Sequence, residues 1–280
     1  MKKKIKSLKR KANQIRKLII EMLATAGSGH PGGSLSSTEI IACLFFEVLR
    51  HNPKDPTWPK RDRFHLSKGH ACPVLYAALS LCGYFDKEEL WHLRKFGALL
   101  QGHADRRVPG IDVGSGSLGQ GLSVALGMAL AGKIDKEDYR VYCLMGDGEL
   151  QEGNIWEAAM AAAHFRVDNL CGIVDYNRFQ IDGRIEEVMN LEPLVNKWEA
   201  FGWHVVQCDG HNIEELLECF READSTKGKP TVIIAHTVKG KGVSFMEHVV
   251  DFHGRAPSEK ERKIALEELE EIESAEESIE

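Results

Sequence analysis

The 280-residue sequence predicts an α/β fold in which a parallel sheet carries helices on both faces. The first observation is a set of four short, unbroken apolar runs in the second half of the chain, which are typical of strands buried on both faces. The second is the helical pattern between these runs. Successive runs begin about 30 residues apart, which leaves room for one helix and implies right-handed crossovers between parallel strands.

Residues 1–131 form a first region of helices and glycine-rich loops. Apolar spacing predicts a first helix over residues 5–24, and Thr38 is placed to cap a second helix that runs to Leu49. The remaining expected helices of this region cover residues 71–82, 87–96 and 122–132. The loops between the helices are GSGHPGG (27–33), SKGH (67–70), QGHADRR (101–107) and GSGSLGQG (114–121).

In the second region, predicted strands alternate with helices. The strands cover residues 141–145, 170–175, 203–208 and 231–236. The helices lie near residues 153–165, 192–201 and 213–223. Because ligands of parallel sheets bind beyond the carboxyl ends of the strands, the residues that follow each strand are candidate site residues. They are Gly146, Asp147 and Gly148; Tyr176 and Asn177; Asp209, Gly210 and His211; and Val238, Lys239 and Gly240.

The composition is that of an ordinary globular protein, with 43% hydrophobic and 28% charged residues. No apolar run approaches the roughly 20 residues that span a bilayer, and the N-terminus lacks the apolar core of a secretion signal. The seven cysteines are scattered and never spaced C-x-x-C, which argues against a disulfide framework or a zinc site. We therefore expect a cytoplasmic protein with reduced thiols.

The net charge of −6 is unevenly distributed. Residues 1–17 hold nine Lys and Arg and no acidic residue, whereas residues 259–280 hold ten Glu. No basic or aromatic stripe follows the basic segment, which favours a solvated first helix over a nucleic-acid or membrane contact. We expect one domain over residues 1–258, followed by a Glu-rich tail at 259–280 that is either a solvated helix or a frayed end.

One motif suggests a dinucleotide site. Gly114, Gly116 and Gly119 match the G-x-G-x-x-G pattern, and a predicted helix follows. That fingerprint also requires a strand directly upstream, and the upstream segment ADRRVPGIDV is polar and interrupted by proline. The dinucleotide interpretation is therefore weak. A loop whose amides approach a phosphate or another polar ligand remains reasonable.

Asp147 and Asn177 carry a stronger signal. Each follows a predicted strand, and the interval between them holds one helix and one strand, so both should reach neighbouring strand ends. Carboxylate and amide oxygens suit Mg²⁺ or Ca²⁺ better than zinc, and Mg²⁺ with few protein ligands usually bridges to phosphates. We therefore expect a diphosphate at this edge. Alternatively, Gly146–Gly148 is only a turn and Asn177 only its cap.

At this point the sequence resembles a known family. The segment from Gly146 to Asn177 is similar to the thiamine-diphosphate signature of a G-D-G followed about 30 residues later by Asn. The surrounding motifs resemble transketolases: SGHPGG (28–33), HLSKGHACPVLY (65–76), GHAD (102–105), GSLGQGLSVALGMA (116–129), GDGELQEG (146–153) and FHG (252–254). The resemblance covers residues 13–256 and implies the thiamine-diphosphate-binding fold.

The resemblance implies a set of cofactor contacts. Asp147, Asn177 and the backbone carbonyl of Phe179 would ligate Mg²⁺ or Ca²⁺ together with diphosphate oxygens. The carbonyl does not depend on its side chain, so a Phe at this position is compatible with the role. The residues implied to contact thiamine diphosphate itself are His70, Gly116, Leu118, Gly146, Gly148 and His253.

The resemblance also implies catalytic roles. His30 and His103 would hydrogen-bond the hydroxyls of the reacting sugar and move protons, with His253 helping to position it. Glu152 would lie at a subunit interface, in a carboxylate network that links two active sites. These are the predicted catalytic residues.

From the residues alone, a single histidine is usually structural. His30, His70, His103 and His253 differ because each lies in a glycine-containing loop, where a ligand can approach closely. The histidines expected to be packing or surface residues are His51, His92, His164, His204 and His236. Undecided are His65, His211 and His248, and also Lys239 and Lys241, which either meet phosphate or lie in a solvated loop.

The resemblance implies a partner. Transketolases carry further domains, one of which binds the pyrimidine of the cofactor, and no second α/β repeat is present here. We therefore expect a separate C-terminal subunit with that domain, in an α₂β₂ assembly. The implied reaction is the reversible transfer of a two-carbon ketol unit from a ketose phosphate to an aldose phosphate, as in the pentose phosphate pathway.

Two alternatives stay open. One is another thiamine-diphosphate enzyme, a 2-oxo acid dehydrogenase α-subunit or a deoxyxylulose-phosphate synthase, although GSLGQG, SKGH and GHAD depart from those relatives. The other is a non-catalytic binding module of the same fold. Asp147, Asn177 and four loop histidines argue against it, because a module without chemistry does not need that set.

Overall fold

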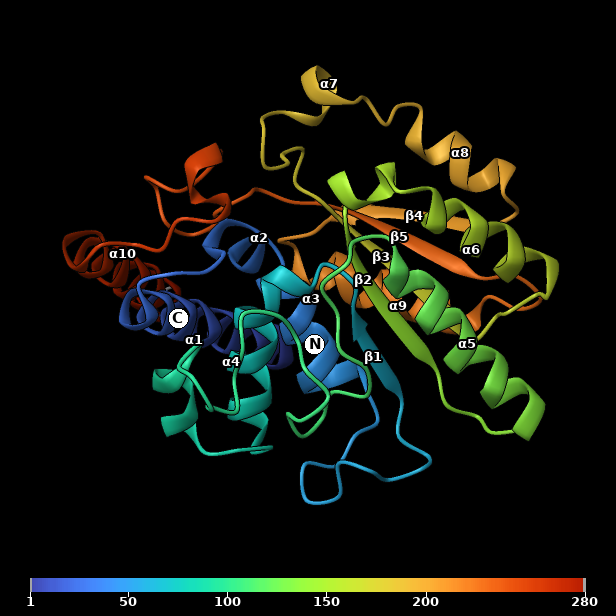
Figure 1. Cartoon of the computed structure of the whole chain (residues 1–280), viewed down its shortest axis with the longest axis horizontal. Coiled ribbons are helices and arrows are strands. Elements are labelled where there is room, and N and C mark those ends of the chain that lie inside the picture. The colour runs from blue at the N-terminus through green and yellow to red at the C-terminus, as the bar shows by residue number, and fades with distance from the viewer. Residues whose placement is uncertain (1, 279–280) are drawn as a thin grey trace.

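The computed structural model describes residues 2–278; Met1 and residues 279–280, the outer ends of the predicted domain and tail, lie outside the described residues. A five-stranded, all-parallel sheet with the order β1-β2-β3-β5-β4 forms its centre (Figure 1). The strands are β1 Arg63–Leu66, β2 Val141–Gly146, β3 Leu170–Tyr176, β4 His204–Asp209 and β5 Thr231–His236. The predicted α/β class with a parallel sheet is confirmed.

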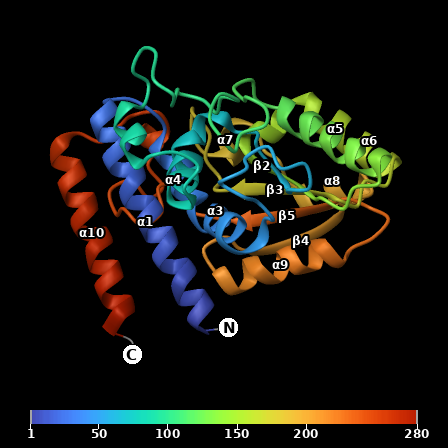
Figure 2. The same ribbon diagram turned by 90° about the horizontal axis from the view of Figure 1, so that it is seen from below.

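Helices cover both faces of this sheet (Figures 1 and 2). The α-helices of the described residues are α1 Lys2–Ala26, α2 Pro31–Ser36, α3 Thr38–Cys43, α4 Cys72–Cys82, α5 Gln120–Asp135, α6 Gly153–His164, α7 Ile185–Val188, α8 Leu194–Ala200, α9 Ile213–Ser225 and α10 Glu259–Ser278. Short 3₁₀ segments lie at Gly69–Ala71, Lys87–His92, Gly148–Gln151 and Val250–His253.

The strands divide the core into two layers because alternate side chains point to opposite faces. On β2, Val141, Cys143 and Met145 pack in the cluster that includes α5, α6 and α8. Tyr142 and Leu144 pack in the other cluster, with α1, α3, α4 and α9. Figure 2 shows α9 on one side of the sheet and α5 and α6 on the other. A strand that is buried on both sides has no polar face, which explains its unbroken apolar sequence.

Several predicted elements differ from the structure. The helix expected from Thr38 to Leu49 is α3 followed by a wider π-helical turn, Leu44–Val48. Thr38 is its first residue rather than its cap, and its hydroxyl donates back to the carbonyl of Ser34. The helix expected over 87–96 is a 3₁₀ segment that ends at His92; Arg94, at φ +63°, does not continue it.

Two strands also differ from expectation. Residues 203–208 were expected to be buried on both faces, but β4 lies at the edge of the sheet, and of its six residues only Cys208 is buried. β1 was not predicted, because four residues are too few to establish a periodicity. β1 pairs with β2 at the opposite edge.

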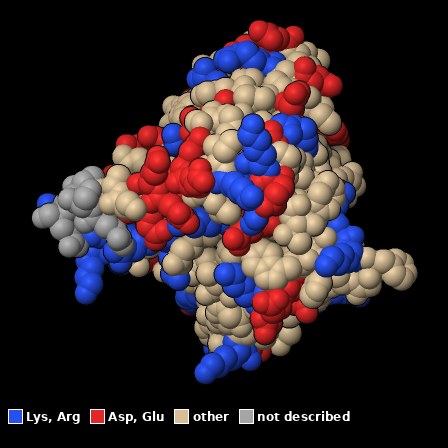
Figure 3. Space-filling view, turned by 90° about the vertical axis from the view of Figure 1, so that its left-hand side faces the viewer, with Lys and Arg blue, Asp and Glu red and all other residues tan. Residues whose placement is uncertain are grey.

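The two ends of the described chain lie side by side, with α10 packed along α1 (Figure 2). Ala265 and Leu269 of α10 are fully buried, and Asn13 of α1 donates to the Leu269 carbonyl at 2.8 Å. The Glu-rich segment is therefore a helix with one packed face. On this side of the molecule acidic and basic side chains are intermingled (Figure 3). Within residues 2–278, no helix has both the length and the apolarity to cross a bilayer.

Candidate functional site

The carboxyl ends of β2 and β3 are neighbours, as the sequence predicted, with Gly146 paired to Asp175. Asp147 follows β2, and its carboxylate accepts hydrogen bonds from the backbone N–H groups of Gly148 (2.8 Å) and Arg178. Because Arg178 directly follows Asn177, the second of these bonds ties the end of β2 to the segment after β3. Asp147 is buried, at 2% exposure.

Asn177 is oriented by two hydrogen bonds. Its side-chain N–H donates to Asp175 Oδ2 at 2.9 Å, and its Oδ1 accepts from the backbone N–H of Phe179 at 3.1 Å. The Phe179 carbonyl faces Lys239 Nζ at 3.4 Å. The three groups predicted to hold a metal therefore belong to one small region of the strand ends.

The donor set in this region fits a hard cation. Both oxygens of Asp147 and the Oδ1 atom of Asn177 accept only one backbone N–H each, so they keep acceptor capacity. No group of three or more His, Cys, Asp or Glu that could hold a metal ion occurs among the described residues. A divalent ion here would need carbonyl and phosphate oxygens as well, which is how Mg²⁺ is commonly bound.

A buried ion pair lies directly beneath this edge. Lys68 Nζ is 2.5 Å from Asp175 Oδ2, and the two side chains are 2% and 0% exposed. Lys68 also donates to the Gly33 carbonyl (2.8 Å) and to Ser37 Oγ (2.6 Å), so it joins α2 and the residue between α2 and α3 to the sheet. Burial acts to raise the pKa of Asp175, but attraction to Lys68 and hydrogen bonds from Lys68, Ser36 and Thr237 together outweigh it, and the pKa is lowered.

Lys239 is the second buried cation, at 1% exposure. Its Nζ lies 2.8 Å from His253 Nδ1 and 3.4 Å from the carbonyl of Gln180. An ammonium group can only donate, so Nδ1 of His253 accepts and the ring carries its proton on Nε2. Burial lowers the pKa of Lys239 to about 8, although Asp147 acts in the opposite direction. Burial, with repulsion from Asp175, raises the pKa of Asp147 to about 7.

The four loop histidines meet in one cluster. His30 precedes α2, His70 lies in a 3₁₀ turn before α4, His103 lies in the 101–107 loop, and His253 ends a 3₁₀ segment. Ring centroids are 5.1 Å apart for His30 and His70, 5.2 Å for His70 and His253, 5.6 Å for His30 and His253, and 6.4 Å for His30 and His103.

The pKa of each of these imidazoles is lowered, which favours the neutral ring. Burial, together with the charge of Arg94, lowers the pKa of His30 to about 4. Burial and the neighbouring Lys239 lower the pKa of His253 to about 3. Burial likewise lowers the pKa of His70 and of His103. Neutral imidazoles can accept a proton from a hydroxyl group.

The glycine-rich loop borders the histidine cluster. A Cβ atom on Gly116 would lie 3.7 Å from the ring of His103. The loop is tied to the sheet by buried Glu149, which accepts the N–H groups of Gly119 and Gly146, both at 3.0 Å. A cavity of 780 Å³ opens beside it, lined by the loops around residues 101–107 and 113–117.

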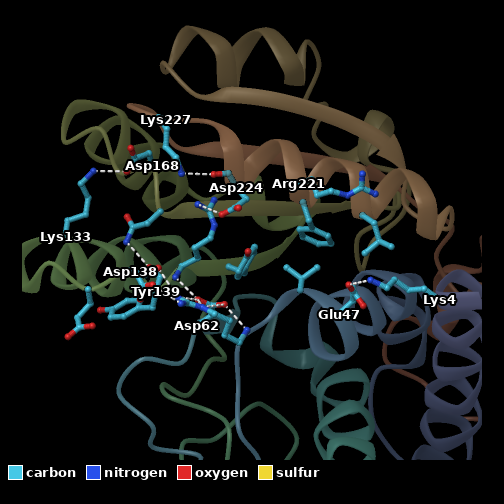
Figure 4. Close-up of a pocket in the computed structure, with 18 residues that line it drawn as sticks. Lys4, Glu47, Asp62, Lys133, Asp138, Tyr139, Asp168, Arg221, Asp224 and Lys227 are labelled. Carbon is cyan, nitrogen blue, oxygen red and sulfur yellow. Dashed lines mark hydrogen bonds and ion pairs between the residues drawn. The ribbon is translucent and has the colours of Figure 1, made fainter. Parts of the chain in front are cut away.

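Four predicted site residues are exposed: His103, Gly116, Leu118 and Glu152. Leu118, at 36% exposure, is in the glycine-rich loop, and Glu152 is exposed at the start of α6, against Gly119. A second cavity, of 840 Å³, opens at the amino ends of the strands, where Asp62, Asp138 and Asp168 lie (Figure 4). Its charged residues largely neutralise one another, as in the Lys133–Asp168 pair at 2.8 Å, so we do not place the site there.

A family comparison bears on this geometry. The model of the transketolase family that is described as the thiamine diphosphate binding domain matches residues 7–270. The chain belongs to the transketolase family. It is 49% identical over 264 residues to the 6-deoxy-6-sulfo-D-fructose transketolase subunit SqwG of Clostridium sp. (strain MSTE9), covering 94% of this chain and 96% of that protein. It is 44% identical to one subunit of the apulose-4-phosphate transketolase of Phocaeicola vulgatus, covering 95% of each.

Other relatives are much longer. The transketolase of Campylobacter jejuni has a crystal structure that matches with a TM-score of 0.89 and 36% identity, over 94% of this chain and 42% of that one. The chain likewise spans 40% of human transketolase, at 45% identity. This transketolase chain is therefore a subunit of a transferase that works with thiamine diphosphate, as the sequence motifs implied.

Several residues of this transketolase site were not singled out from the sequence. Lys68 lies within the SKGH motif, but only the structure shows that its partner is Asp175, 107 residues away. Glu149 and Arg94 were also missed. Its place in the glycine-containing SKGH motif was the available signal for Lys68, whereas Arg94 had none.

Proposed function

We propose that this subunit binds Mg²⁺–thiamine diphosphate at the carboxyl ends of β2 and β3 and transfers a two-carbon ketol unit between sugar phosphates in complex with a pyrimidine-binding partner subunit. The observation that carries the proposal is that Lys239 contacts both the Phe179 carbonyl, next to Asp147 and Asn177, and His253 of the histidine cluster. Asp147, Asn177 and Phe179 are the proposed metal ligands.

The proposed diphosphate contacts follow from charge and hydrogen-bond direction. Lys239 supplies a buried positive charge, and the Nε2–H of His253 is available to donate to a phosphate oxygen. His70 lies 5.2 Å from His253 between ring centroids and is the second proposed donor. Gly146, Gly148 and Gly116 allow the backbone to approach the cofactor, and Leu118 is proposed to lie against it.

Bound thiamine diphosphate supplies the carbon nucleophile for the bond exchange. The chain's own contribution at the reacting end is proposed to be His30 and His103, which as neutral imidazoles accept and return the proton of a sugar hydroxyl. The Nδ1 atom of His30 is buried without a hydrogen-bond partner in the described part of the chain. A polar atom left in this state supports a ligand at that position.

The substrate class is proposed from the chemistry that two relatives share. One relative is named for 6-deoxy-6-sulfo-D-fructose and the other for apulose-4-phosphate, and both names describe a ketose with an anionic end. We propose sugar phosphates, as in the pentose phosphate pathway. Glu152 is exposed and is proposed to lie at a subunit interface of an α₂β₂ assembly. All seven cysteines are free thiols, which supports a cytoplasmic location.

The test uses calorimetry and a transfer assay. The wild-type chain should bind thiamine diphosphate in the presence of Mg²⁺, whereas Asp147→Ala and Asn177→Ala should bind it at least tenfold more weakly, because each removes a hard oxygen ligand. Ketol transfer from a ketose phosphate should require the partner subunit. Transfer by this chain alone, or unchanged affinity in both variants, contradicts the proposal.

A further inference from the structure

A network of three buried, hydrogen-bonded side chains contacts the loop that carries Lys239. It runs from Arg16 of α1 to Glu39 of α3 and then to His211, which follows β4. Arg16 Nη2 is 2.5 Å from Glu39 Oε1, and His211 Nδ1 is 2.9 Å from Glu39 Oε2. All three side chains are buried or nearly so, with 9%, 9% and 13% exposure. The sequence left His211 undecided.

The far end of His211 holds the backbone of the loop. The N–H group of Val238 donates to His211 Nε2 at 2.8 Å. A backbone amide can only donate, so Nε2 must be the acceptor and the proton of the neutral ring lies on Nδ1, which donates to Glu39. Burial acts to raise the pKa of Glu39, but Arg16 and His211 outweigh it and hold the pKa at about 2. Glu39 is therefore a permanent acceptor, and the ring orientation is determined at both nitrogens.

Arg16 holds the loop at a second point. Its Nε donates to the Lys241 carbonyl at 3.0 Å. The three side chains therefore hold the loop backbone at Val238 and at Lys241, on either side of Lys239. The loop backbone is unusual there: Gly240 has φ +82°, and a Cβ atom on it would lie 2.2 Å from the Met246 carbonyl oxygen. The bond from the His248 N–H group to the Lys239 carbonyl, at 3.0 Å, closes the loop from Lys239 to His248.

We infer that His211, oriented by Glu39 and Arg16, is a positioning residue that fixes the backbone from Val238 to Lys241 and thereby aims the Lys239 ammonium at the cofactor diphosphate. This inference rests on the proposed function, because it needs a diphosphate at Lys239. The buried Arg16–Glu39 ion pair contributes little net stability, since desolvation offsets the attraction. Its main effect is to fix the loop backbone, because the long Lys239 side chain reaches the diphosphate only from a defined backbone position.

Two variants separate positioning from folding. In His211→Gln the side-chain amide reaches the position of Nε2 and its oxygen can accept the Val238 N–H. In His211→Asn the amide reaches only the position of Nδ1, so the bond to Glu39 is kept and the bond to Val238 is lost. Each variant loses one buried hydrogen bond, so the two should lower the unfolding midpoint to a similar extent.

The measured quantity is the Kd of the chain for thiamine diphosphate at saturating Mg²⁺, by calorimetry. We expect His211→Asn to raise it about tenfold, equivalent to about 1.4 kcal/mol, and His211→Gln to change it less than twofold. His204→Asn is the matched control, because it removes a histidine–glutamate pair (His204–Glu222, 2.7 Å) at the opposite end of β4. It should leave the Kd unchanged. Hydrogen exchange of the Val238 amide without cofactor should be faster in His211→Asn only.

The outcomes distinguish the two proposals. Wild-type chain that binds no cofactor overturns the proposed function itself. Equal Kd values for wild type and both His211 variants, or equal losses in both variants, overturn the positioning role. Should His211→Asn fail to fold, the ¹⁵N chemical shifts of the wild-type His211 ring decide: a protonated Nδ1 with an accepting Nε2, and a protected Val238 amide, support the inference. A ring protonated on Nε2 refutes it.

Discussion

The buried pair of Lys68 and Asp175 provides a quantitative test of how the site is held together. The side chains are 2% and 0% exposed, and the distance between Lys68 Nζ and Asp175 Oδ2 is 2.5 Å. Removing one partner of such a pair leaves an uncompensated buried charge and typically costs about 3–5 kcal/mol. Removing both charges together costs far less, because two desolvation penalties disappear with the attraction.

The structure indicates where in that range each variant should lie. In Lys68→Met, Asp175 keeps three donors, the Ser36 hydroxyl at 2.6 Å, the Asn177 amide at 2.9 Å and the Thr237 hydroxyl. We therefore expect about 3 kcal/mol of destabilisation. In Asp175→Asn, Lys68 keeps only two neutral acceptors, so about 4 kcal/mol is expected. The double variant should lose no more than either single one.

Urea unfolding followed by fluorescence of the five tryptophans measures all three variants. The coupling energy of the double-mutant cycle should be at least about 4 kcal/mol, because the double variant loses no more than the smaller of the two single losses. Lys4→Met is the control, because the Lys4–Glu47 pair is half-exposed, at 49% and 31%, and should be worth less than about 1 kcal/mol. If the effects of Lys68→Met and Asp175→Asn simply add, the pair is not coupled and the reasoning is refuted.

Three further outcomes are expected. His103→Ala should lower kcat at least about a hundredfold and leave the Kd for the cofactor within threefold, as measured by steady-state kinetics and calorimetry; equal kcat values remove it from the proton-transfer role. His65 is 3% exposed, and burial lowers its pKa to about 4, so between pH 6.5 and 4 the unfolded state binds a proton that the folded state does not. As the pH falls through this range, the free energy of unfolding of wild type should therefore decrease about 1.4 kcal/mol per pH unit faster than that of His65→Gln. The same pH dependence of urea unfolding in both proteins contradicts this. Leu269→Ala should destabilise the chain by about 2–4 kcal/mol, because the side chain is fully buried between α10 and α1; a change below 0.5 kcal/mol, roughly that of a surface site, refutes that packing.

The sequence predicted the parts of the fold that local patterns determine. Unbroken apolar runs marked β2, β3 and β5, and the strand-end rule placed Asp147 and Asn177 at neighbouring tips. The sequence could not show that β4 lies at an edge of the sheet, because an apolar run such as that of β4 can occur in an edge strand as well as in a central one. Strand order is decided by packing between distant segments, which leaves no periodic signal in either strand.

The same limit applies to the site. Glycine-containing loops pointed to the four histidines, and the structure brings them within one cluster. The pairs that orient the loops were not predictable, since Lys68 meets Asp175 across 107 residues and Arg16 meets Lys241 across 225. Local sequence patterns identify side chains that could bind a ligand or take part in catalysis. The partner of each side chain depends on where the backbone brings distant loops together.

The two buried lysines at the carboxyl ends of the strands differ in their partners, and this difference bears on where an anion binds. Asp175 neutralises Lys68, whereas Lys239 has no carboxylate within ion-pair distance among the described residues and contacts a neutral histidine and two carbonyls. Burying a cation without a counter-charge is unfavourable, so an anion at Lys239 relieves a cost that the folded chain already carries. The diphosphate end of the proposed site is thus prepared within this subunit. A cavity opens beside residues 113–117, and we propose that the partner subunit closes the site there.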